Sequence, residues 1–260
     1  HTAVNFSSLR VDSINPMLMK EIKKVRKTSF TIAPEAGSQR LRDFINKGLT
    51  DDQILNAARE IYEEGWSLIK LYFMVGLPTE TPADVQAISV LCRRVKEVFL
   101  DASRSVGRIG EITVSIGAFV PKPTTPFQWA GMDTVAVLRK KLKSVKQELR
   151  AVANVRVHAD NPLQAFIQAL LSRGDRRVSQ VLVDAHGNGG NWPQTLKASA
   201  LDASFYVHRI RPETECFPWD FINHGIEKAF LWREYQRALA GQSTPACPLD
   251  GDCVRCGVCK

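Results

Sequence analysis

A repeated pattern of apolar strand, turn and helix most constrains how this chain folds. It occurs at residues 28–50, 68–85 and 111–129, where each apolar run ends at a turn containing Pro or Gly. In the first copy, Ala33-Pro34 ends the run, and a Glu-Ala-Gly-Ser turn leads into a basic helix over 38–46. Such units favour a parallel sheet. We therefore expect an α/β fold with ligands at the carboxyl ends of the strands.

The helices carry start signals, and their distribution suggests a division of the chain. Thr50 to Gln53 reads as a capping box, and Thr81 followed by Pro82 reads as an N-cap with Pro in the first turn. After a strand-like segment at 155–158, the chain turns mainly helical. We expect an α/β domain over 1–160, a helical extension over 161–242 and a Cys-rich tail over 243–260.

The composition limits the kinds of partner that we expect for this chain. The chain is 44% hydrophobic and 24% charged, which is ordinary for a globular protein. No run approaches the ~18 apolar residues of a membrane span, so no membrane partner is expected. The net charge of +8, concentrated at 20–27 and 138–150, permits RNA as a partner, although solvated helix faces also explain such runs.

The cysteines point to a metal rather than to disulfides. Four of the six lie in the last fourteen residues, which is not the distribution of a secreted disulfide framework, so we expect a reducing cytoplasm. Their spacing suits a tetrahedral site for zinc or an iron–sulfur cluster, and the choice between them stays open. The predicted ligands are Cys247, Cys253, Cys256 and Cys259. Cys92 and Cys216 are expected to be buried thiols.

Three ordered motifs resemble segments of the radical S-adenosylmethionine (SAM) enzymes. They are IAPEAGSQRLRDFINKG, YFMVGLPTET and GAFVPKPTTPFQW. Together with RGDRR, PWD and the C-terminal CVRCGVC, they most resemble radical SAM proteins that carry an N-terminal cobalamin-binding-like domain. The resemblance covers essentially the whole chain. Independently of it, the charges of RGDRR are expected to form ion pairs at a helix start.

This resemblance implies the second half of a partial (β/α) barrel, followed by the helical extension and the Cys-rich tail. It implies SAM and a [4Fe-4S] cluster as cofactors, an electron donor as partner, and a 5′-deoxyadenosyl radical that acts on an unidentified substrate. Cobalamin would be a further cofactor in a region before His1. The family's Cys-x3-Cys-x2-Cys segment is absent from these 260 residues. We therefore expect the cluster ligands to lie outside this chain, which would be a fragment and inactive alone.

The resemblance also implies roles for five residues. Glu35 would bind the ribose hydroxyls of SAM. Lys47 would bind its carboxylate, with Arg10 as a second candidate for that role. Met74 and Ala118 match the positions that flank the adenine. On the plainer interpretation, Met74 and Ala118 are core residues and Lys47 is a solvated cation at a helix end.

Two other functions remain open on the sequence. One is a non-catalytic RNA-binding protein whose basic helices contact phosphates and whose tail is a zinc knuckle. The other is a degenerate barrel kept as a scaffold, with metal in the tail and no cleavage of SAM.

Overall fold

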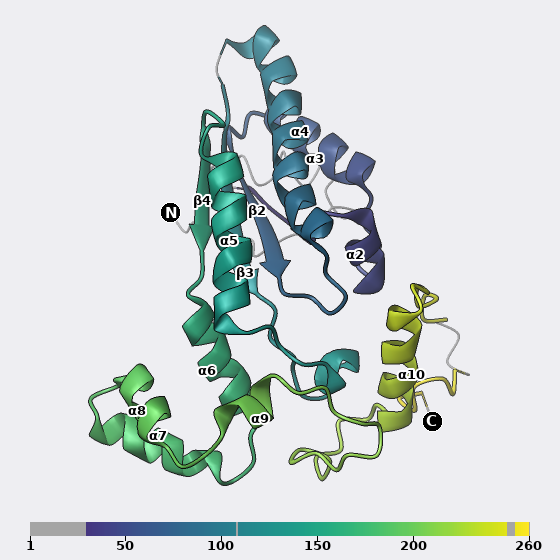
Figure 1. Cartoon of the computed structure of the whole chain (residues 1–260). Helices are drawn as coiled ribbons and strands as arrows, with labels where there is room; N and C mark the ends of the chain where they lie inside the picture. Colours follow the sequence, from purple (N-terminus) through teal and green to yellow (C-terminus); the bar gives the residue numbers. More distant parts are fainter. Residues whose placement is uncertain (1–29, 108, 249–252, 260) are drawn as a thin grey trace, which may run out of the picture. The chain divides into compact units, whose positions relative to one another are not determined.

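The computed structural model describes residues 30–107, 109–248 and 253–259 (Figure 1). These residues form two compact units. The first contains the described residues up to Ala118 together with Leu138–Asp160, and the second contains Phe119–Val137 and the described residues from Asn161 onward. The sequence placed 119–137 with the α/β part, whereas the structure groups this segment with the helical part. Arg10 lies outside the described residues.

The first unit is built on a parallel sheet with the strand order β1-β2-β3-β4. The strands are β1 (Phe30–Glu35), β2 (Leu68–Val75), β3 (Glu111–Ala118) and β4 (Val155–Ala159). The helices between them are α2 (Gln39–Phe44), α3 (Asp51–Glu63), α4 (Pro82–Val106) and α5 (Val135–Leu149). The expected α/β fold is therefore confirmed.

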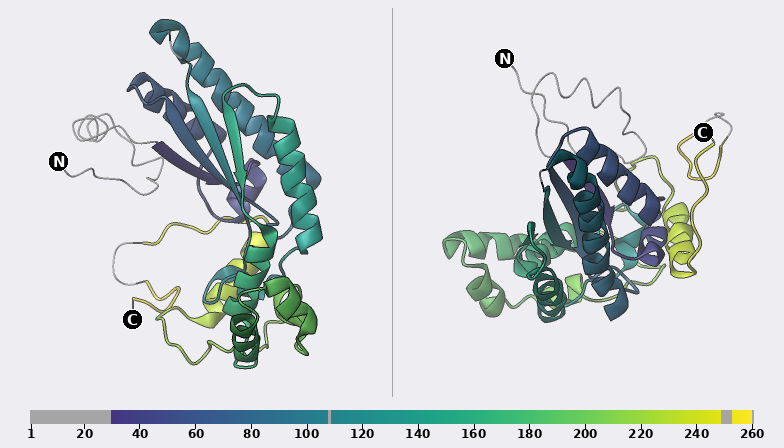
Figure 2. Two further views of the ribbon diagram at one scale, coloured as in Figure 1. Left: turned by 90° about the vertical axis from the view of Figure 1, so that its left-hand side faces the viewer. Right: turned by 90° about the horizontal axis from the view of Figure 1, so that it is seen from above.

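Burial alternates along the strands and distinguishes the two faces of the sheet. One face carries the apolar core of the unit, with Ile32, Ile69, Leu71, Phe73, Val75, Ile112, Val114 and Ile116 buried. The opposite face is half-buried or exposed and includes Lys70, Tyr72, Thr113 and Ser115. Parallel strands joined in sequence by right-handed crossovers place their helices on one face. Figure 2 shows the strands side by side, with α4 and α5 running along the sheet.

The predicted helix starts are confirmed. Thr50 Oγ1 accepts a hydrogen bond from the Gln53 amide at 3.2 Å, and Gln53 Oε1 accepts one from the Thr50 amide at 2.9 Å. Thr81 forms the corresponding box with Asp84, and Pro82 occupies the first turn of α4. These caps fix where α3 and α4 begin. Helix α4 starts directly after the turn that follows β2, whereas α3 starts after α2 and a short loop.

The second unit is mainly helical, as expected, and its described residues contain no strand. Its elements are the 3₁₀ helix η2 (Pro126–Trp129), α6 (Pro162–Arg173), α7 (Val178–Gly187), α8 (Trp192–Ala198), α9 (Ala203–Val207) and α10 (Lys228–Leu239). No helix in the described parts of the chain combines the length and the apolar character needed to cross a bilayer.

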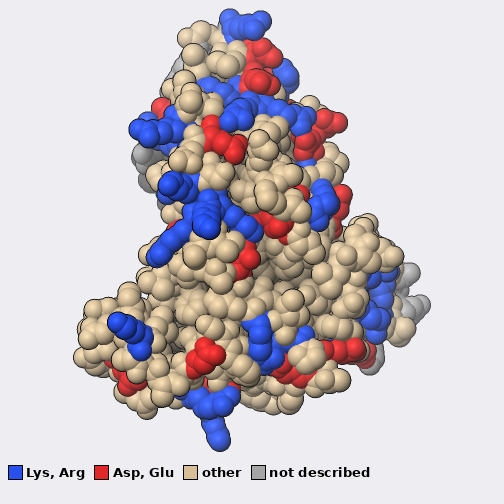
Figure 3. All heavy atoms as spheres, in the orientation of Figure 1, with Lys and Arg blue, Asp and Glu red and all other residues tan. Residues whose placement is uncertain are grey.

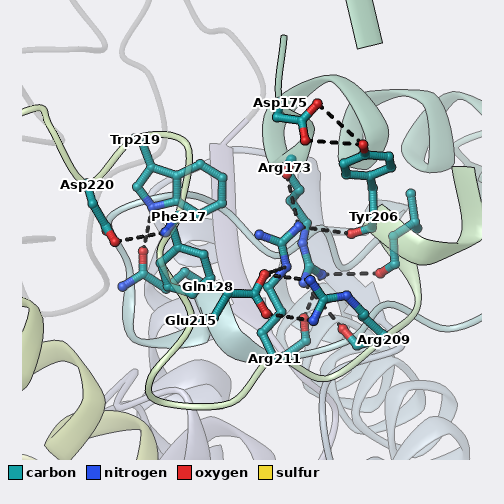
Figure 4. Close-up of polar contacts among 12 residues, drawn as sticks. Gln128, Arg173, Asp175, Tyr206, Arg209, Arg211, Glu215, Phe217, Trp219 and Asp220 are labelled. Atoms are coloured by element: carbon teal, nitrogen blue, oxygen red, sulfur yellow. Dashed lines mark hydrogen bonds and ion pairs between the residues drawn. The ribbon is translucent and has the colours of Figure 1, made fainter. Parts of the chain in front are cut away.

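Buried arginines connect the segments of this unit (Figure 4). Arg173 Nη1 donates to the carbonyls of Ala130 at 2.6 Å and Val207 at 3.2 Å. Arg211 Nη2 donates to the Arg173 carbonyl at 2.9 Å. Burial, together with the neighbouring arginines, lowers the pKa of Arg173 to about 9. The first arginine of RGDRR therefore has a structural role.

An ion pair accounts for Asp175 and Arg177 of RGDRR, and hydrogen bonds account for Trp219 and Asp220 of the PWD motif. Arg177 Nη2 pairs with Asp175 at 2.6 Å at the start of α7, which confirms the expected ion pair. Trp219 Nε1 donates to Gln128 Oε1 at 2.8 Å, and the Asp220 carboxylate accepts the Phe217 amide at 2.8 Å. These motifs stabilise the helical unit and need no ligand to account for them.

Candidate functional site at the carboxyl edge of the sheet

The backbone at the end of β1 is irregular. Ile32 pairs with Leu71 and Glu35 pairs with Phe73, so two residues of β1 lie opposite one residue of β2. Pro34 is one of the two, and a bulge tolerates a residue that has no amide hydrogen. Glu35 then takes the left-handed conformation with φ 68°. Such a conformation costs of order 1–3 kcal/mol in a non-Gly residue and persists only where its surroundings hold it.

Arg42 holds the turn that follows this strained residue. Its side chain is 0% exposed and donates to the carbonyls of Ala36 at 3.2 Å, Gly37 at 2.9 Å and Leu49 at 2.8 Å. Gly37 itself lies against α4, because a Cβ at this position would be 2.1 Å from the Ile88 amide nitrogen. The turn is therefore fixed from both sides, by a guanidinium and by a helix backbone.

Asp84 connects the turn after β1 to the turn after β2. It accepts hydrogen bonds from Ser38 Oγ at 2.6 Å and Thr81 Oγ1 at 2.7 Å, and it forms an ion pair with Arg40. Burial alone would raise the pKa of Asp84, but the hydrogen bonds from Arg40, Ser38 and Thr81 hold it well below its usual range. The carboxylate therefore stays ionised and fixes two loops at the same edge of the sheet.

The structure brings together two of the predicted site residues. Lys47 Nζ lies 3.2 Å from Glu35 Oε1, and the two side chains are 33% and 29% exposed. The chain returns to the end of β1 through left-handed residues on either side of Lys47, namely Asn46 with φ 52° and Gly48 with φ 61°. The second carboxylate oxygen and the remaining ammonium hydrogens keep capacity for a polar ligand.

The sheet register does not place Met74 and Ala118 together. Met74 pairs with Gly117, whereas Ala118 pairs with Val75, whose side chain is buried on the core face. Because side chains alternate between faces, the alternation assigns Met74 and Ala118 to opposite faces. The methyl group of Ala118 therefore does not share a face with the Met74 side chain.

Asp160 lies beside the glycine that faces Met74. A Cβ on Gly117 would be 3.2 Å from Asp160 Oδ2. The Asp160 amide donates to the Ile116 carbonyl at 3.0 Å, which fixes the residue directly after β4. A second carboxylate, which is exposed where Glu35 is half-buried, thus stands at the edge that carries Glu35, at the end of another strand.

Glu80 holds the Gly-Leu-Pro turn after β2. Its side chain is 1% exposed, lies 2.6 Å from Lys141 Nζ, and accepts the Gly76 amide at 2.8 Å. Gly76 has φ 86°, which only glycine adopts at little cost. Glu80 belongs to the motif YFMVGLPTET, in which the sequence suggested no role for it. In the structure it stabilises the turn after β2.

The predicted tail ligands are free thiols, as are the two other cysteines. Cys247 and Cys259 are exposed, and Cys253 and Cys256 are half-buried. The tail is attached to the start of α10, where the Glu227 amide donates to the Cys256 carbonyl at 2.8 Å. Within the described residues, no three His, Cys, Asp or Glu side chains are placed to hold a metal ion. The tail metal site therefore stays a prediction.

Three polar residues of this edge were not predicted as important from the sequence. Arg42 lies in a basic helix that suggests solvated charges. Asp84 follows Thr81 by three residues, which is the spacing of a capping box, so the sequence could have indicated its role. Asp160 follows a strand directly, as Glu35 does, and this shared position could also have identified it. The buried Cys92 was expected, but the expectation that Cys216 is buried was wrong, because that thiol is exposed.

Comparison with known proteins identifies a family for the first part of the chain. Residues 1–91 match the family model of the Radical SAM superfamily. An uncharacterised protein of Methanocaldococcus jannaschii is 36% identical over 176 residues, which are 68% of this chain and 36% of that protein. The chain thus spans about a third of the length of the curated relative it matches. No solved structure matches the chain.

Proposed function

We propose that this chain belongs to the radical SAM superfamily, whose family model matches residues 1–91, and that it forms the SAM-binding second half of a radical SAM partial barrel. The four-stranded parallel sheet is consistent with part of such a barrel. The observation that carries the proposal is the strained Glu35 at the carboxyl end of β1, which lies within the matched residues and beside Lys47. Arg42 and Asp84 hold the surrounding turns.

The donor set at this edge fits SAM. The Glu35 carboxylate would accept hydrogen bonds from the two ribose hydroxyls, and the Lys47 ammonium would attract the methionyl carboxylate. Half-buried Met74 would pack on the adenine ring, with the backbone at Ala118 beside it. When bound, SAM and a reduced [4Fe-4S] cluster supply the radical that removes a hydrogen atom from a substrate. The residues of this chain bind and orient SAM.

The ligands of that cluster are not provided here. The sequence contains no Cys-x3-Cys-x2-Cys, so we propose that the cluster is bound by residues outside these 260. An electron donor, and cobalamin in a further domain, belong to the same proposal. We also propose that the tail cysteines bind zinc or an iron–sulfur cluster in a reducing cytoplasm, since the chemistry of four closely spaced thiolates fits either metal.

Glu35→Gln tests the proposal, with Glu63→Gln on the exposed end of α3 as a matched control. Ligand-observed saturation-transfer NMR measures SAM binding, because it detects the weak affinity expected without the cluster. Loss of a charged hydrogen-bond acceptor costs ~1.5–3 kcal/mol, or about tenfold or more in Kd. We expect that loss only in Glu35→Gln. Equal SAM binding by wild type and both variants would show that Glu35 does not hold the ribose.

A non-catalytic RNA-binding protein is the second candidate, and the exposed cations of α5 favour it. It predicts zinc in the tail and no binding of SAM to the wild-type chain. The same NMR titration therefore separates the two functions.

A further inference from the structure

The solvent-facing side of α5 carries several exposed cations. Leu138, Leu142, Val145 and Leu149 are buried against the sheet. The residues that face outward include Arg139, Lys140, Lys143 and Lys146, with Arg150 directly after the helix. Figure 3 shows Lys and Arg side chains gathered over α5. These five cations are called the α5 basic stripe below.

The stripe has no compensating acid within the described residues. The single acid of α5, Glu148, is half-buried and lies 4.0 Å from Arg93 of the neighbouring helix α4. By contrast, other surface arginines of this unit pair with carboxylates, as in Arg94 with Asp51 and Arg156 with Glu111 at 3.3 Å. The five cations of the stripe form no such pair with a described residue. Unpaired like charges on one rigid face repel each other and attract a polyanion.

The geometry of the stripe is a straight row. Arg139, Lys143 and Lys146 follow each other at intervals of four and three residues, which places them on one side of the helix, and Arg150 lies directly after its end. At 1.5 Å per residue, the helical part of the row is roughly 10 Å long. The packed leucines behind it keep the helix in place. A partner with a regular row of negative charges fits this surface better than one with a single charge.

We propose that the α5 basic stripe is a docking surface for the phosphate backbone of helical RNA. A lipid surface fits less well, because membrane-surface helices insert an apolar face and the apolar face of α5 packs on the sheet. A flexible single strand also fits less well, because its bases stack on aromatic side chains and the stripe has none. The neutral residues between the cations, Ser144 and Gln147, are exposed and can hydrogen-bond to 2′-hydroxyl groups.

The inference does not depend on SAM binding, because it rests on a different face of the first unit. It adds a polyanion to the partners of the proposed enzyme and does not decide whether RNA is the substrate. Binding would be insensitive to base sequence and sensitive to salt, because the stripe contacts phosphates and not bases.

The test compares two doubly substituted full chains with equal changes in charge. Lys143→Glu/Lys146→Glu alters the stripe, and Arg176→Glu/Lys197→Glu alters two exposed cations of the helical unit. Fluorescence polarisation with a labelled RNA hairpin measures Kd at several salt concentrations. We expect the stripe variant to lose about tenfold or more in affinity and to reduce the salt slope by about two, as for two lost phosphate contacts. The control should stay close to wild type.

Three outcomes would overturn the proposal. These are no binding of RNA by the wild type, equal weakening in both variants, and equal binding of a DNA duplex of the same sequence. Vesicles containing phosphatidylserine serve as a further arm, and preferential binding to them would assign the stripe to membranes instead. Circular dichroism confirms the fold of each variant. If the two glutamates unfold α5, the variant Lys143→Gln/Lys146→Gln is used instead. We expect it to reduce the salt slope by the same amount.

Discussion

Arg42→Met tests whether one buried guanidinium supports the turn that positions Glu35. The guanidinium donates to the carbonyls of Ala36, Gly37 and Leu49, and methionine fills most of its volume without a donor. Each buried hydrogen bond of this kind contributes ~1–1.5 kcal/mol, so three of them amount to about 3–4.5 kcal/mol. The pairing with half-exposed Asp51 adds little, because Arg94 keeps that carboxylate paired.

Urea unfolding of the full chain, followed by circular dichroism, measures this difference in the free energy of unfolding. Arg59→Met is the control, because Arg59 lies on the exposed face of α3 and its replacement should change stability by less than ~0.5 kcal/mol. Arg42→Lys should fall between the two, since an ammonium cannot reach all three carbonyls. It also gives a measurement if Arg42→Met does not fold. A loss below ~1 kcal/mol in Arg42→Met would refute the role of Arg42.

Two further predictions concern the Asp84 carboxylate and the cysteine tail. The pKa of Asp84 is lowered on folding, so its contribution is fully present above the unfolded value near 3.9 and is lost as the pH falls through the folded value. The stability difference between wild type and Asp84→Asn should therefore shrink on acidification from pH 6 to pH 3 in urea titrations, and a constant difference would contradict the assignment. Cys256→Ser should lower the zinc or iron content of the chain after reconstitution with either metal, as measured by mass spectrometry. Cys216→Ser is the control, because Cys216 is an exposed thiol outside the tail, and it should leave the metal content unchanged. Equal metal content in both variants would exclude the tail site.

The sequence predicted the features that depend on interactions between residues close together in the chain. The capping boxes at Thr50 and Thr81 depend on residues three positions apart, so they are visible without the fold. The meeting of Glu35 and Lys47 was implied by the resemblance to a family. The face of Ala118 was not predicted, because it depends on pairing with β2, which is a contact distant in sequence. The exposure of Cys216 was missed because its surroundings lack a helical or strand period.

Arginines show most clearly why charge alone misleads. A net charge of +8 suggests a basic surface, yet Arg42, Arg173 and Arg211 are buried and donate to backbone carbonyls. The planar guanidinium suits this role because it offers several fixed donors to carbonyls from different segments. Within the part of the chain that the structure describes, the α5 basic stripe consists of five exposed cations without an acidic partner, and the other face of this helix is leucine and valine. The burial and pairing of each cation, rather than the net charge, therefore decide which surface can attract a polyanion, and they support the proposal for α5.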